Sequence, residues 1–262
     1  MTNPEVLVRF GFSLERGGAH LARTMMLDEL SLLLAYVNDS EAKKDDYYKA
    51  IVNDNCLGKR SLSTRKLTAN YLANQYALDF DCAIFRSMLF FWNRDEEGRP
   101  LLAVLCSYTR DAILRANIPL ILAKEEGCIV VREDLEQFIE QREPLRFSKA
   151  TLKSAAQNIN STCTQAGYTV GRVKKIRTRA KPTPGTAAFA LFLGYITGVR
   201  GEALLETEYA KLLDCSSGRI IELAEDASRS GWIVFKRVGK VIEVLFPRLL
   251  NEQEMEWINE QD

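Results

Sequence analysis

One order of predicted elements occurs twice in this chain, and the repetition limits the possible folds more than any other feature. The stretch after Ser148 has apolar residues at three- and four-residue spacing, which is typical of a helix, and Gly167 ends it. β-Branched residues then alternate around a turn at Gly171, as in a hairpin. A second helical pattern ends at Gly231, and two apolar strands joined across residues 237–240 follow. Each hairpin is preceded by a helix, a short extended segment and two further helices.

We therefore predict a mostly α-helical fold in four parts. An N-terminal helical region, similar to a helix-turn-helix, covers residues 1–99 and includes one long helix over 19–37. Two winged-helix-like units with short β-hairpins follow, over 100–181 and 186–250, and the second has an extended piece at 203–205. The tail over 251–262 has five acidic and no basic residues, which favours a solvated end. Docking of the tail through Met255, Trp257 and Ile258 is the alternative.

The charged residues are unevenly distributed along the chain. In total, 35 basic residues balance 35 acidic ones, but residues 146–181 contain nine Lys or Arg and no Asp or Glu. The remainder therefore has 26 basic and 35 acidic residues. This separation predicts a positive face that attracts polyanions before any specific contact forms.

A winged helix places one helix in the major groove of DNA, and its hairpin lies along the phosphates. We expect phosphate contacts from the basic residues of the helix and hairpin: Lys149, Lys153, Arg172, Lys174, Lys175, Arg177, Arg179 and Lys181. Candidates for reading bases are Gln157, Asn158 and Asn160. The alternative is a solvated strand pair at a domain edge, where lysines prevent aggregation.

A second basic cluster begins a predicted helix in the N-terminal region. No acid occurs between Asn55 and Leu78, and the cluster combines hydroxyl and cationic side chains: Lys59, Arg60, Ser61, Ser63, Thr64, Arg65 and Lys66. Unpaired N–H groups at a helix N-terminus bind phosphate, so this corner is a second candidate DNA contact. An ordinary serine cap with exposed cations explains the same pattern.

The second winged unit has a different charge pattern. Its third helix carries Arg219 but also Glu222, Glu225 and Asp226, whereas its hairpin has three basic residues. Binding to DNA and packing against protein both stay open for this unit.

Groups for catalysis are scarce. His20 is the only histidine, which nearly excludes a histidine metal site and leaves one possible centre for a Ser-His-Asp triad. Its place at a helix start favours a surface or capping role. Asp79 and Asp81 fit helix caps better than a magnesium site, and no phosphate-binding loop or dinucleotide fingerprint occurs. We therefore predict no catalytic residues, no metal and no cofactor.

The composition favours a cytoplasmic protein without a membrane segment. The longest apolar run, 187–199, is too short for a bilayer, and the N-terminus lacks a signal-peptide core. The six cysteines are widely spaced without a CxxC pair, so we expect reduced core residues.

Three stretches resemble the BrxA family, the small helical component of bacterial BREX phage-exclusion systems. They are the run NCLGKRSLSTRKL at 55–67, the run CSYTR at 106–110, and the capped helix ending in Ala-Gly at 147–167. The resemblance covers about residues 6–181. It implies a non-enzymatic protein that binds double-stranded DNA beside other BREX proteins.

The resulting hypothesis is a DNA-binding accessory protein of bacterial phage defence that binds mainly through phosphates. Three alternatives remain: a scaffold or adaptor whose basic face binds an acidic partner, a helical RNA-binding protein, and a metal-dependent nuclease.

Overall fold

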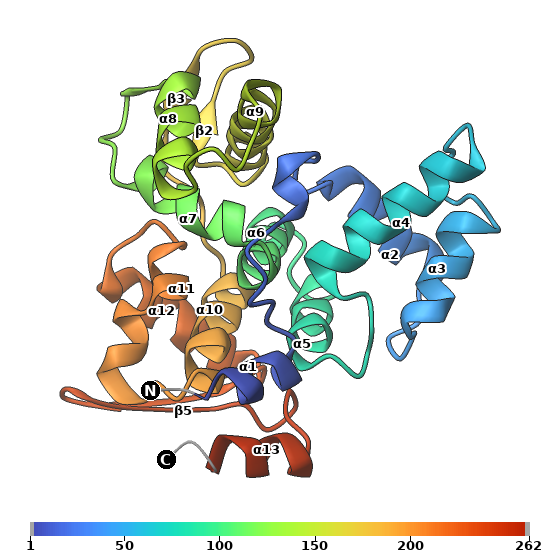
Figure 1. Ribbon diagram of the computed structural model, residues 1–262. Helices are drawn as coiled ribbons and strands as arrows, with labels where there is room; N and C mark the ends of the chain where they lie inside the picture. The colour runs from blue at the N-terminus through green and yellow to red at the C-terminus, as the bar shows by residue number, and fades with distance from the viewer. Residues whose placement is uncertain (1–2, 260–262) are drawn as a thin grey trace.

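The computed structural model describes residues 3–259, most of which are helical, with two small antiparallel sheets (Figure 1). The N-terminal region consists of α1 (Pro4–Phe10), the 3-10 helix η1 (Ala19–Leu21), α2 (Leu27–Val37), α3 (Lys44–Val52), α4 (Leu62–Tyr76) and α5 (Ala83–Trp92). Helices α2, α3 and α4 lie together on the right of Figure 1. No helix within residues 3–259 is both long and apolar enough to span a bilayer.

The first of the two repeated units is built around a three-stranded sheet. It contains α6 (Arg99–Arg110), α7 (Ala112–Leu122), β1 (Ile129–Val130), α8 (Arg132–Arg142), α9 (Lys149–Gln165), β2 (Thr169–Val170) and β3 (Lys175–Arg177). The strand order is β1-β3-β2, with both pairs antiparallel, and Ile176 of β3 lies between Ile129 and Val170. The predicted order of elements is confirmed here.

The second unit has a helical turn in place of the predicted extended piece. Its elements are α10 (Pro184–Ile196), the 3-10 helix η2 (Gly201–Glu206), α11 (Glu208–Lys211), α12 (Ser217–Arg229), β4 (Val234–Val238) and β5 (Val241–Leu245). The prediction of an extended segment at 203–205 is wrong. The adjacent residues Leu204 and Leu205 are both buried, which a strand with one solvent-exposed face does not allow but a helical turn does. η2 packs beside β5, and this sheet has two strands among the described residues.

The apolar side chains of all the parts form one continuous core. Its centre is α10, whose residues from Gly185 to Ile196 are all buried, and which packs against α5, α6 and α12. A helix that is apolar on every side belongs in an interior, which explains the central position of the apolar run at 187–199.

The acidic tail forms a docked helix. Within α13 (Glu252–Asn259), Glu254 is buried and its carboxylate lies 2.6 Å from the Arg86 guanidinium. The ring of Trp257 packs edge-on against Phe10, and Ile258 is buried. The solvated-end prediction is therefore wrong for this helix, while residues 260–262 lie outside the described residues.

His20 is buried, contrary to the predicted surface or capping role. Its Nδ1 lies 2.8 Å from Asp111 Oδ2, and its Nε2 lies 2.9 Å from Thr162 Oγ1. Burial by itself raises the pKa of Asp111, but attraction to His20 and hydrogen bonds from His20 and Leu114 outweigh burial and lower it. All three side chains are sealed from solvent, so the network holds η1 against α7 and α9.

The same network interrupts the helix predicted over 19–37. The Met25 N–H donates to Thr162 Oγ1, and Met26 takes a left-handed φ of 52°. The helix consequently begins only at Leu27. Hydrogen bonds to residues far along the chain outweigh the local helical preference here.

The substitution Thr162→Val should destabilise the protein by about 1–3 kcal/mol, the cost of unpaired buried polar groups. Valine has nearly the same shape, but the Met25 N–H and His20 Nε2 lose their partner. Urea unfolding gives the free energy. Ser161→Ala, on the half-buried neighbouring residue of α9, serves as the control, and an equal loss in both variants would contradict a role for the hydroxyl.

Candidate nucleic-acid interface

One face of α9 presents long polar side chains to solvent. Lys149, Lys153 and Gln157 are exposed at four-residue intervals, which places them on the same side of the helix. Ser148 caps the helix, since its Oγ accepts a hydrogen bond from the Thr151 N–H at 3.2 Å. The exposed N-terminal half of α9 thus carries two cations and one amide side by side.

The β2–β3 turn is exposed at the same end of the molecule. Gly171 has a φ of +106°, and an added Cβ would lie 2.2 Å from the Lys174 carbonyl oxygen, so the turn requires glycine. Arg172 and Lys174 are exposed, and Val173 between them is 95% exposed. The half-exposed Lys175 donates from Nζ to the Gly171 carbonyl at 2.7 Å and braces the turn. In Figure 1, α9 and the turn beyond β2 and β3 both lie at the top.

Four of these cations form what we call the basic surface: Lys149, Lys153, Arg172 and Lys174. Within residues 3–259 none of the four makes an ion pair. Lys181 is also exposed and unpaired there, in the segment between β3 and α10. Exposed cations that no acid neutralises are what an electrostatic contact with a polyanion requires.

Arg177 does not belong to this surface, and its predicted contact with phosphate is wrong. The side chain is 1% exposed and pairs with Asp214 at 2.6 Å. It also donates to the carbonyls of Tyr168 and Leu122. In β3 the side chains alternate, so the partly exposed Ile176 places Arg177 on the inner face.

The Asp214 carboxylate also binds Arg179, whose side chain is 55% exposed, at 2.7 Å, and it accepts a hydrogen bond from the Ala180 N–H. The hydrogen bond and charge of Asp214 raise the pKa of Arg179. Asp214 precedes α12, so it joins the hairpin of the first unit to the second unit. Arg179 is thereby neutralised in part and is a weaker candidate for phosphate than the sequence predicted.

The corner at the start of α4 is formed as predicted but is partly neutralised. Ser61 caps the helix by accepting from the Thr64 N–H at 3.1 Å. Lys59 pairs with Glu29 of α2 at 3.0 Å, and Arg65 donates to the carbonyls of Lys59 and Val52. Three side chains of the predicted set, Arg60, Ser63 and Lys66, remain exposed without such partners within the described part of the chain.

The two basic clusters do not form one surface. In Figure 1, α4 lies on the right and the turn beyond β2 and β3 lies at the upper left. A separation seen in projection is a lower bound on the separation in space. The α4 corner is therefore a separate surface.

Of the three candidates for base reading, only Gln157 faces solvent. Asn158 is half-buried and donates from Nδ2 to the His20 carbonyl at 3.1 Å. Asn160 is 6% exposed, and its Oδ1 has no hydrogen-bond partner among the described residues. η1 covers this part of α9, a contact that no local pattern in the sequence indicates.

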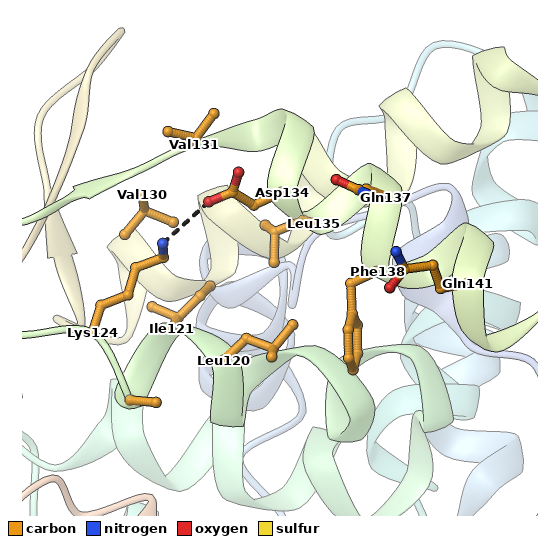
Figure 2. A pocket seen from close by; sticks show the side chains of 11 residues that line it. Leu120, Ile121, Lys124, Val130, Val131, Asp134, Leu135, Gln137, Phe138 and Gln141 are labelled. Carbon is orange, nitrogen blue, oxygen red and sulfur yellow. Dashed lines mark hydrogen bonds and ion pairs between the residues drawn. The ribbon is translucent and has the colours of Figure 1, made fainter.

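The first unit also has an apolar groove between α7, β1 and α8. Figure 2 shows Leu120, Ile121 and Phe138 lining it, with the ion pair of Lys124 and Asp134 at one end. Its volume is about 400 Å³, and it holds no convergent set of titratable groups. Across residues 3–259, no group of three or more His, Cys, Asp or Glu could hold a metal ion.

No protein-family model matches this chain, and no curated protein aligns with it. The proposal of DNA binding below therefore rests on the geometry and charge of these surfaces.

On α12 and the β4–β5 hairpin of the second unit, several charges are paired. On α12, Arg219 lies 2.7 Å from Glu222, and Arg229 pairs with Asp226. On the hairpin, Lys236 lies 3.0 Å from Glu243 of the opposite strand. Arg237 and Lys240, near the β4–β5 turn, are exposed cations without an ion pair in the described residues.

Proposed function

We propose that this protein is a non-enzymatic double-stranded DNA-binding protein whose first unit is a winged helix. The order of α7, β1, α8, α9 and the β2–β3 hairpin, with strands arranged β1-β3-β2, supports this assignment. In such a unit α9 is the helix that enters the major groove and the β2–β3 turn is the wing.

The observation that carries the proposal is the basic surface itself. Four cations from α9 and the wing are exposed and unpaired within the described residues, on a segment without a single acid. Because the contacts are to phosphates, binding is expected to be largely independent of sequence. Gln157 is the one predicted base-reading side chain in a position to touch base edges.

The resemblance to the BrxA family supports a role in bacterial phage defence, beside other BREX components in the cytoplasm. The run at 55–67 that carries the resemblance forms the α4 corner, where Arg60 and Lys66 offer a second contact with phosphate. The partially buried Lys59 and Arg65 hold that corner in shape.

Fluorescence anisotropy with a labelled duplex, titrated at several salt concentrations, tests the proposal. The four phosphate contacts of the basic surface alone predict a slope of about −3.6 for log K against log salt, at about 0.9 per contact, and each further contact makes the slope steeper. Structured RNA and an acidic polypeptide serve as competitors. Absence of binding at about 50 mM salt, or better competition by either alternative than by unlabelled duplex, would contradict DNA as the partner.

A further inference from the structure

The turns of the two hairpins share the same chemistry. The first turn contains the run Arg-Val-Lys at 172–174. The second contains the similar run Arg-Val-Gly-Lys-Val at 237–241. The valines are 95%, 81% and 73% exposed for Val173, Val238 and Val241 respectively. Because these valines are exposed, they contribute little hydrophobic stabilisation to the free protein. Their recurrence beside cations at the same place in both units indicates a shared contact.

The second hairpin is paired up to its turn and anchored at its base. Val238 pairs with Val241, and the turn between them passes through Gly239 with a φ of +59°. The inner face of the hairpin is anchored by Phe235, Ile242 and Val244, all buried in the core. Figure 1 shows the hairpin extending from the body at the lower left, so its turn is open to a large partner.

The charges around this turn favour an anion. Lys236 is neutralised by Glu243, which leaves Arg237 and Lys240 as cations without an ion pair within residues 3–259. Arg237 donates from Nε to the Gly239 carbonyl at 3.1 Å, which orients its guanidinium at the turn. By contrast, both arginines of α12 are paired with acids of the same helix, and the additional Glu225 leaves α12 with a net charge of −1, which does not favour a contact with phosphate.

We propose that the β4–β5 turn is a second DNA contact, in which Arg237 and Lys240 bind phosphates and the exposed valines lie against the sugars. The second unit then touches DNA through its hairpin alone, while α12 faces away from the duplex. This inference rests on the proposed DNA binding by the first unit and adds a separate site to it. Proteins that bind the minor groove likewise combine Arg or Lys side chains with apolar ones.

The test compares two variants that each remove two positive charges from the second unit. Arg237→Gln with Lys240→Gln alters the hairpin turn, and Arg219→Gln with Arg229→Gln, on α12, is the matched control. Both are titrated against a labelled duplex of about three helical turns, roughly 32 base pairs. The hairpin variant should lose about tenfold or more in affinity, with a salt slope shallower by about 1.8, whereas the control should stay within about twofold of wild type.

A third variant, Val238→Ser with Val241→Ser, keeps the charge and should weaken binding about threefold or more at an unchanged salt slope, because serine removes apolar surface from the turn but no cation. Equal affinity of the hairpin charge variant and the control, with wild type binding normally, would overturn the second contact and leave the first unit's role intact. Unchanged affinity of the serine variant would overturn the contact of the valines with the sugars. Failure of the wild type to bind the duplex would overturn both proposals.

Discussion

Reversal of the four charges of the basic surface should reduce the affinity for duplex DNA at least about 100-fold, because each phosphate contact that is removed takes with it the free energy of counterion release. The variant combines Lys149→Glu, Lys153→Glu, Arg172→Glu and Lys174→Glu. All four side chains are exposed and unpaired among the described residues, so the free energy of unfolding should change by less than about 0.5 kcal/mol per site. Anisotropy at one salt concentration and urea unfolding measure the two quantities.

A control variant separates the effect of losing a local contact from the effect of changing the net charge. It reverses four exposed cations outside the basic surface, Lys44, Lys49, Lys211 and Arg248, and therefore changes the net charge by the same amount. If binding depended only on the net charge of the protein, both variants would lose the same affinity. Equal losses would thus contradict a binding surface on α9 and the wing.

The second large effect is expected on the free energy of unfolding when Asp214 is replaced. Asp214→Asn should destabilise the protein by about 3 kcal/mol, since loss of one partner of a buried ion pair leaves the other charge uncompensated. Arg177 is that partner, with a side-chain exposure of 1%, and Asp214 itself has 3%. Asparagine tolerates the left-handed φ of 55° at this position, so the variant isolates the loss of charge from backbone strain. Urea unfolding gives the difference in free energy.

Arg179→Gln is the matched comparison, because Arg179 binds the same carboxylate through a side chain that is 55% exposed. An ion pair that solvent reaches contributes about 0–1 kcal/mol. The double variant Arg177→Met with Asp214→Asn should recover part of the lost stability, because it removes the uncompensated buried charge while asparagine keeps the left-handed φ of 55°. A loss in Asp214→Asn no larger than in Arg179→Gln would contradict the structural role of the pair.

Residues whose roles depend on near neighbours were predictable from the sequence. Ser61 and Ser148 cap the helices that they precede, and Gly167 follows the end of α9, because caps and helix ends depend on a few adjacent residues. The apolar run of α10 and the order of elements in the first unit follow from periodicity in the same way.

Contacts between distant residues decided the rest. The charge pattern identified Arg177 as a cation, but Asp214, 37 residues later, turned it into a structural residue. Glu29, on another helix, neutralises Lys59. Hydrogen bonds with Asp111 and Thr162 hold His20 in the interior, and the helix predicted over 19–37 is interrupted there. A basic residue in a sequence is free to bind DNA only if no carboxylate packs against it. Whether one does depends on how helices far apart in the chain come together, because buried charges are tolerated only when such partners meet.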